Sequence, residues 1–178
     1  METFTEPRPL VESPRYSRER EDVLEQLDPR TLDAPIAELV ARLNVLPFCF
    51  TLQSCYGHFI WRPGQDDRSL EPVPDEDCGQ VRYRIAYLAL CLENSTAGRA
   101  LHRSLRNTAA TDPEYVQFGS ADWFWERHAN SYALQVEPAR YQHRDEALLD
   151  HEEALRVEER RNRLFEELAN LVRATATP

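Results

Sequence analysis

Residues 54 to 58 read Ser-Cys-Tyr-Gly-His and follow an apolar run that is typical of a buried strand. A turn here would gather backbone N–H groups, a hydroxyl, a thiol and an imidazole within a few residues. Such a nest of donors suits a carboxylate or a phosphate, and Gly57 would allow a positive φ or a close approach to a ligand. The alternative is structural: Gly57 only makes the turn, and Cys55 packs as a small apolar side chain.

The same turn raises the possibility of a metal or a nucleophile. Cys49, Cys55 and His58 would need a distant partner, Cys91 or His102, to complete a zinc site. No pair of these residues has the tight spacing of structural zinc sites, so no metal centre is predicted. A Cys55–His58 nucleophilic pair has less support, because no third group that would orient the imidazole is evident.

Two groups of arginines form a second candidate constellation. Arg99, Arg103 and Arg106 are spaced by four and three residues on a predicted helix, and Arg82 and Arg84 begin a predicted strand. If these faces coincide, the five side chains form an RNA- or phosphate-binding patch. The alternative is a solvated helix face that pairs with nearby glutamates.

Aromatic and acidic clusters give weaker signals. Trp123, Trp125 and Tyr132 would suit a base-stacking platform, although alternating aromatic residues usually belong to a core. The segment 62–80 carries six carboxylates but lacks the glycine spacing of a calcium loop. It is predicted to be a solvated, flexible loop.

The composition limits both the class of protein and its chemistry. The 178 residues are 42% hydrophobic, which predicts one globular domain, and all 21 basic residues are arginine. Without lysine, Schiff-base and P-loop chemistry are excluded. The net charge of −10 argues against broad, non-specific binding of nucleic acid. No apolar run reaches the roughly 20 residues of a membrane helix, and the start lacks a signal-peptide core, so a cytoplasmic protein without membrane contact is predicted.

The pattern of apolar residues predicts an α+β fold with N-terminal helices, a mixed or antiparallel sheet of five to six strands and a long C-terminal helix. Residues 1–16 are predicted to form a flexible arm, and 17–173 a single domain. The elements expected in that domain are a helix capped by Ser17, a helix from Asp33 to Asn44, strands at 48–53, 59–61, 81–92 and 115–118, a helix from Asn94 or Ser95, a hairpin over 122–136 turning at Ala129-Asn130, and a helix over 140–173. The strand at 59–61 is expected to pair with that at 48–53.

The C-terminal helix has an apolar stripe but a charged centre, EERRNR. This pattern predicts a helix that packs at its ends and is solvated in its middle. The alternative is a coiled-coil homodimer through this helix.

The order of these elements resembles the tRNA wybutosine-synthesizing protein three family over residues 18 to 172. The residues that carry the resemblance are Leu27-Asp28, Asp33 to Ile36, Leu43-Asn44, the turn Ser54-Cys55-x-Gly57, and Asn162-Arg163 in the C-terminal helix. The family turn reads Ser-Ser-Cys-Ser-Gly-Arg; here Gln53, Tyr56 and His58 depart from it.

The resemblance implies an S-adenosylmethionine-dependent methyltransferase that acts on a modified guanosine in tRNA and whose fold is not of the Rossmann type. It implies that Ser54, Cys55, Gly57 and His58 bind S-adenosylmethionine. His58, or Asp28 if the fold brings it near, would take a proton. The altered turn and the acidic charge favour an alternative, a non-catalytic binding module that has kept the fold and lost the methyltransferase site.

Overall fold

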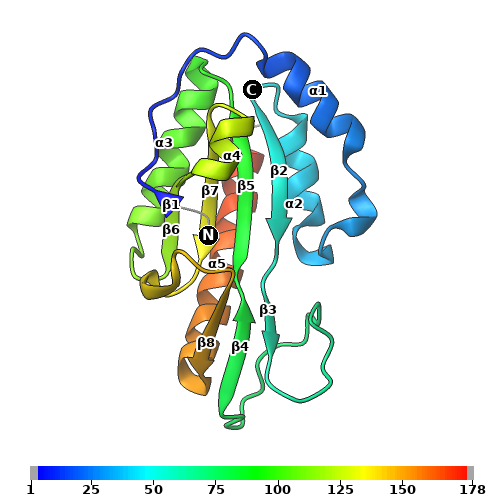
Figure 1. Ribbon diagram of the computed structural model, residues 1–178, viewed down its shortest axis with the longest axis vertical. Coiled ribbons are helices and arrows are strands. Elements are labelled where there is room, and N and C mark those ends of the chain that lie inside the picture. The colour runs from blue at the N-terminus through cyan, green and yellow to red at the C-terminus, as the bar shows by residue number, and fades with distance from the viewer. Residues whose placement is uncertain (1–3, 176–178) are drawn as a thin grey trace.

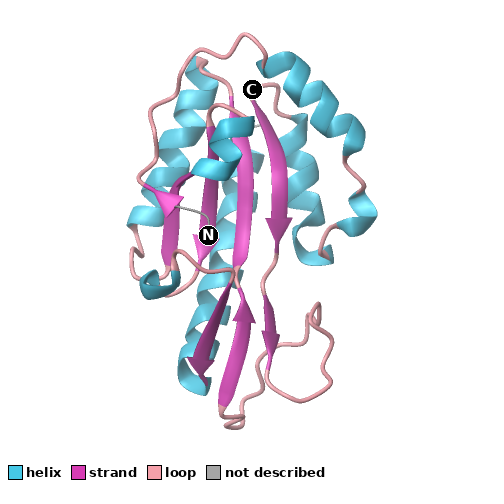
Figure 2. Ribbon diagram, viewed as in Figure 1, coloured by secondary structure: helices cyan, strands magenta, loops and turns pink. Residues whose placement is uncertain are grey.

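The strands form two antiparallel sheets that lie end to end (Figure 2) in the computed structural model, which describes residues 4–175. The strands of the larger sheet, in spatial order, are β1 (Phe4–Thr5), β6 (Val116–Ala121), β7 (Ser131–Val136), β5 (Ala86–Leu92) and β2 (Cys49–Cys55). The smaller sheet consists of β3 (His58–Ile60), β4 (Gln80–Arg84) and β8 (Glu146–Asp150). The α+β class is therefore confirmed, but the strands are divided between two sheets instead of one.

Three stretches of chain pass from one sheet to the other, namely 49–60, 81–92 and the segment that joins β7 to β8. The run 81–92, predicted as one strand, divides at Ile85, whose N–H donates to the carbonyl of Asp145. Residues 49–60 cross at Tyr56-Gly57, so β2 pairs with β5 while β3 pairs with β4. The predicted hairpin between 48–53 and 59–61 is therefore wrong, and the unusual turn lies at the junction of the two sheets.

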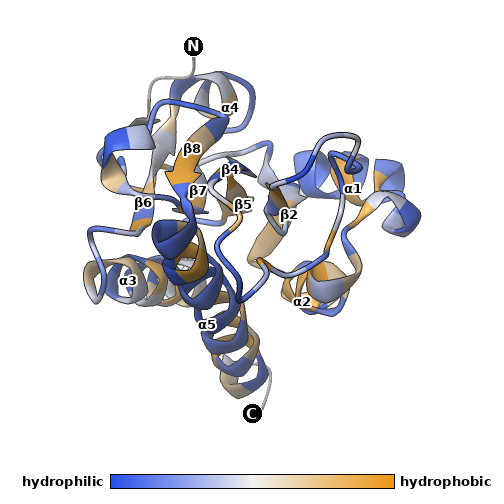
Figure 3. Cartoon of the chain, turned by 90° about the horizontal axis from the view of Figure 1, so that it is seen from below, coloured by the Kyte–Doolittle hydropathy of each residue, from blue (hydrophilic) through white to orange (hydrophobic). Residues whose placement is uncertain are grey.

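Helices cover the two faces of the larger sheet unequally. The helices are α1 (Tyr16–Gln26), α2 (Ala34–Val45), α3 (Thr96–Ala110), α4 (Asp122–Arg127) and α5 (His151–Thr175), with short 3-10 turns η1 (Pro29–Thr31) and η2 (Ala139–Tyr141). Figures 1 and 3 show α2, α3 and α5 behind the sheet, and α1 and α4 in front of it. The predicted apolar face of α2 is buried in the main core, with Leu88, Leu90 and Leu92 of β5. On the front face, β5 presents Ala89 and Cys91 to smaller clusters.

The C-terminal helix begins later than predicted and buries one face along its length. Residues 146–150 form β8, in which Ala147 and Leu149 point inward. In α5 the buried side chains include Leu164, Leu168 and, at its charged centre, Arg161. The prediction of a solvated centre is therefore wrong at Arg161, which donates to the Gly57 carbonyl at 3.0 Å.

The predicted strand over 122–126 is instead the short helix α4, and the hairpin is made by β6 and β7. Alternation over only five residues also fits a turn and a half of helix, so the pattern alone could not decide. Trp123 is 38% exposed, with the Arg127 guanidinium 3.8 Å from its ring centroid. An arginine of the same helix thus lies over the indole face on which a nucleobase would stack.

From Phe4 onwards the predicted flexible arm 1–16 is attached to the larger sheet, and residues 1–3 lie outside the described part of the chain. β1 pairs with β6, and the Asn130 side chain exchanges two 2.8 Å hydrogen bonds with the backbone of Val11. Ser17 lies inside α1, which begins at Tyr16. Within residues 4–175, none of the helices is long and apolar enough to span a membrane.

Tyr83 ties the two sheets together at the junction. Its buried hydroxyl donates to the Val136 carbonyl at 2.8 Å and accepts from the Ala86 N–H at 2.9 Å. We expect Tyr83→Phe to lower the free energy of unfolding by about 1–3 kcal/mol, because it leaves a buried N–H without its partner. Urea denaturation measures this change. The control is Tyr141→Phe, which removes a hydroxyl that donates to Leu148 near the surface; an equal loss in both variants would contradict the role of Tyr83.

Candidate functional site

A cavity of about 1000 Å³ lies at the junction of the two sheets, on the front face. Ala121 and Ala133 border it, and their small side chains leave space that larger residues would fill. The turn that begins at Ser54 and the segment 142–146 form further walls. Its size is at the upper end of the roughly 300–1000 Å³ typical of ligand sites.

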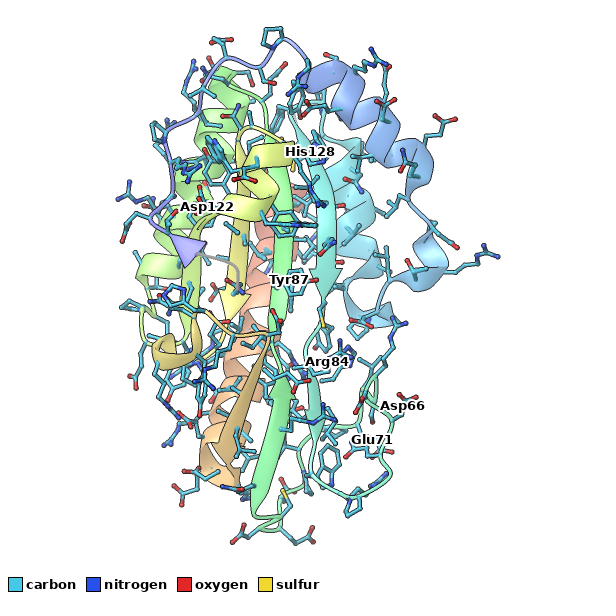
Figure 4. All side chains as sticks on the ribbon, viewed as in Figure 1. Asp66, Glu71, Arg84, Tyr87, Asp122 and His128 are labelled. Carbon is cyan, nitrogen blue, oxygen red and sulfur yellow. The ribbon has the colours of Figure 1, made fainter. Side chains whose placement is uncertain are left out.

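A β-bulge in β2 places the thiol of the turn on the cavity side. The register shifts between Thr51 and Gln53, and beyond the shift Cys55 lies opposite Tyr87 of β5. Since a one-residue shift exchanges the two faces of a strand, the bulge aligns Cys55 with the front face. Cys55 and Tyr87 both border the cavity, and the Tyr87 hydroxyl donates to Gln53 Oε1 at 3.3 Å. Figure 4 shows Tyr87 beside β5, with Arg84 below it at the junction.

Asp33 supplies an acid that the sequence did not identify as part of the site. It precedes α2 at the N-cap position, but its carboxylate accepts the Tyr56 N–H at 2.8 Å and lies 3.4 Å from His58 Nε2. Arg68, from the loop 62–80, places its guanidinium 3.6 Å from the other carboxylate oxygen. The anion bound by the turn is thus the Asp33 carboxylate of the protein itself. At least one backbone donor of the turn, the Tyr56 N–H, is therefore already used.

His58 is held as a cation in this arrangement. Its side chain is 3% exposed, and its Nδ1 lies 3.1 Å from the Ser69 carbonyl. The hydrogen bond to Asp33, followed by that to Cys55, raises the pKa of His58 to about 10 although burial opposes the charge. Burial also opposes ionisation of Asp33, yet His58 and the Tyr56 N–H hold the pKa of Asp33 below its usual value. A protonated imidazole attracts anions, whereas the predicted role of proton acceptor needs the neutral form.

Gly57 lies behind the cavity wall, while Ser54, Cys55 and His58 border the cavity itself. Its φ is +87°, and its N–H donates to Cys55 Sγ at 3.4 Å. A Cβ added at this glycine would come within 2.8 Å of the Ala86 side chain. The glycine therefore makes the crossing between the sheets possible, and the side chains around it form the wall.

Asp28, the other predicted proton acceptor, lies elsewhere. It caps η1, forms two 2.9 Å hydrogen bonds with Arg30, and borders a separate depression beside Trp123. The acid that reaches His58 is Asp33, five residues further on. An N-cap aspartate usually binds its own helix, so the sequence offered no signal for this tertiary contact.

The predicted arginine patch is divided between two parts of the molecule. Arg84 borders the cavity, and its strand neighbour Arg82 pairs with Asp67 and Glu146. Arg99, Arg103 and Arg106 lie on α3 against the larger sheet, away from β4 (Figure 1). Two arginines that the sequence analysis did not single out, Arg68 and Arg144, border the cavity with Arg84.

The loop 62–80 is irregular but attached, in contrast to the predicted flexible segment. The Ser69 carbonyl contacts His58, and the Val73 N–H donates to Glu158 of α5. Asp66 and Glu71 lie on the outer part of the loop (Figure 4), where Glu71 pairs with Arg62 at 2.7 Å. The inner residues of the loop thus help to close the site around His58.

The zinc set that was considered as an alternative, Cys49, Cys55 and His58 with Cys91 or His102, does not assemble. Cys49 and Cys91 are fully buried on neighbouring strands of the larger sheet, and Cys91 Sγ contacts the Ala129 carbonyl. His102 packs against Phe118 and Tyr132. Among the residues that the structure describes, Cys55 and His58 converge with Asp33 alone.

Comparisons with known proteins relate this chain to others through its fold alone. No family model and no curated protein matches the sequence. Among solved structures, the PH1069 protein from Pyrococcus horikoshii is similar, with a TM-score of 0.51 and 15% sequence identity. The match covers 92% of this chain and 97% of that one. The architecture is therefore shared along nearly the whole of both chains.

Proposed function

We propose that this protein binds S-adenosylmethionine in the cavity at the sheet junction and transfers its methyl group to a modified nucleoside in RNA or to a related small molecule. The main support for this proposal is the cavity itself. Three of the four residues that the resemblance implies as S-adenosylmethionine ligands border it. Those residues are Ser54, Cys55 and His58.

The lining offers partners for each part of this ligand. Arg84 and Arg144 carry guanidinium groups for a carboxylate or a phosphate. Tyr87 and Phe124 provide aromatic surface for an adenine. The volume leaves room for an acceptor beside the cofactor, which matters because methyl transfer depends mainly on alignment of the two reactants.

The acceptor and the setting belong to the same proposal. Local arginines at the cavity would let an acidic protein approach RNA, and an enzyme of tRNA modification would work in the cytoplasm. A homodimer through α5 would have to use its charged surface, because Leu164, Leu168 and Val172 are buried within the chain.

The alternative is a binding module that has kept the fold and lost the methyltransferase site. The internal hydrogen bonds of the turn favour this alternative, because they already use groups that a ligand would need. The Asp33 carboxylate accepts the Tyr56 N–H, Cys55 Sγ accepts the Gly57 N–H, and Arg161 donates to the Gly57 carbonyl. Isothermal titration of the full chain with S-adenosylmethionine separates the two functions. Saturable binding, followed by transfer of labelled methyl groups to total tRNA, supports the enzyme, and a lack of heat at millimolar ligand supports the module.

A pair of arginine variants locates the ligand. We expect Arg84→Met to weaken S-adenosylmethionine binding by about 1.5–3 kcal/mol, the usual contribution of a hydrogen bond to a charged group. Arg103→Met on α3 is the matched control and should leave the affinity unchanged. Titration calorimetry on both variants measures the difference, and equal affinities would place the ligand outside this cavity.

A further inference from the structure

Three side chains with metal-binding atoms meet at one edge of the cavity. They come from separate elements: Asp33 precedes α2, Cys55 ends β2, and His58 begins β3. One ligand atom from each residue lies within 4.8 Å of the other two. His58 Nε2 and Asp33 Oδ2 are 3.4 Å apart, close to the edge of about 3.3–3.5 Å that zinc bond lengths give in a tetrahedron.

The surroundings orient these atoms as an outer shell does in metal sites. The Ser69 carbonyl lies 3.1 Å from His58 Nδ1, and because a carbonyl only accepts, Nδ1 keeps its proton. Nε2 faces Asp33, and a metal ion bound there would displace the Nε2 proton of the cationic imidazole into solvent. The Gly57 N–H donates to Cys55 Sγ, and the Tyr56 N–H donates to the Asp33 carboxylate.

The Asp33–His58 contact alone would also be satisfied by an ion pair. Cys55 distinguishes a metal site from a simple ion pair, since an ion pair has no need of a thiol with a backbone N–H donor beside it. A mixed set of thiolate, imidazole and carboxylate suits zinc, whereas magnesium and calcium prefer oxygen ligands alone.

We propose that Asp33, Cys55 and His58 bind a zinc ion, with its fourth coordination position open to the cavity. All three residues border the cavity, and three protein ligands with one open position are typical of catalytic zinc, whereas structural sites are closed by four. The site would place a Lewis acid on the cavity wall, where it can polarise an oxygen or a sulfur of a bound molecule. This inference does not depend on S-adenosylmethionine binding.

The test uses the full chain after removal of metals with a chelator, and zinc and cobalt as probes. We expect about one zinc per chain by elemental analysis. Cobalt should give the near-ultraviolet thiolate charge-transfer band and the intense visible bands of a tetrahedral site. Less than stoichiometric zinc, or a cobalt spectrum without the thiolate band, overturns the proposal without any variant.

Two cysteine variants then identify the ligand. Cys55→Ser should abolish the thiolate band and weaken zinc binding by more than about 100-fold, beyond the loss typical of an outer-shell change. Cys78→Ser is the control, because Cys78 is a free, partly buried thiol outside the trio. Circular dichroism of the metal-free variants verifies folding. Unchanged binding in Cys55→Ser, or an equal loss in Cys78→Ser, contradicts the assignment.

Discussion

Replacing Gly57 with alanine should lower the free energy of unfolding by about 2–5 kcal/mol, through backbone strain and overpacking together. Residues with a side chain rarely adopt a φ of +87°. The new Cβ would also lie 2.8 Å from the Cβ of Ala86 and 2.9 Å from Cε2 of Tyr83. Both neighbours belong to the packed crossing between β4 and β5, so neither can move freely. Urea denaturation followed by circular dichroism measures the loss.

Gly64 provides a control that separates strain from crowding. Its φ is +77°, but no described atom lies within 4 Å of a Cβ built there. Gly64→Ala should therefore cost only the strain, about 1–2 kcal/mol. If the two variants lose the same stability, the junction is less tightly packed than its geometry indicates.

Much of the architecture could be predicted because local patterns record it. The apolar face of α2 follows from residues spaced by three and four, and its start follows from the N-cap Asp33 with Pro35 in the first turn. A break in the strand at Gly57 was identifiable because glycine interrupts an apolar run, although the chain crosses to the other sheet there instead of forming the predicted hairpin. These signals depend on neighbours along the chain, so one sequence suffices to find them.

The errors arose where a pattern was short or a contact was distant. Five residues of β8 alternate in burial, yet they precede a helix without a break and were included in it. The run 81–92 was predicted as one strand, because the inward-facing apolar residues of β4 lead without a break into β5, which is buried on both faces beyond Ile85.

The candidate site was only partly predictable, for a related reason. Cys55 and His58 were identified because they stand in one turn with a glycine. Asp33, more than twenty residues away, joins them only because α2 packs behind β2 and brings its N-cap residue to the turn. Its carboxylate contacts Tyr56 and His58, and nothing in the local sequence distinguishes this from ordinary helix capping.

Glu137 should make the stability of the protein depend strongly on pH. Its side chain is completely buried after β7, and neither carboxyl oxygen has a hydrogen-bond partner within residues 4–175. Burial raises the pKa of Glu137 to about 8 from an ordinary 4.5. Because the folded state favours the protonated form, the stability contribution is complete below pH 4.5 and is lost as the pH rises towards 8. Over that interval this one group should lower the free energy of unfolding by about 1.4 kcal/mol per pH unit.

Glu137→Gln keeps the shape of the acid and removes its titration. At pH 8.5 the variant should be more stable than the parent protein by about 3–5 kcal/mol, and at pH 5 the difference should shrink to about 1 kcal/mol. Urea denaturation at both pH values gives these differences, and effects of other titrating groups cancel because they are common to both proteins. Glu114→Gln, at an exposed position on the neighbouring segment, removes the same charge and should change stability by less than about 0.5 kcal/mol at either pH. If the difference in the free energy of unfolding between Glu137→Gln and the parent were the same at both pH values, Glu137 would be ionised in the folded protein throughout. It would then have a cationic or hydrogen-bonding partner at the junction.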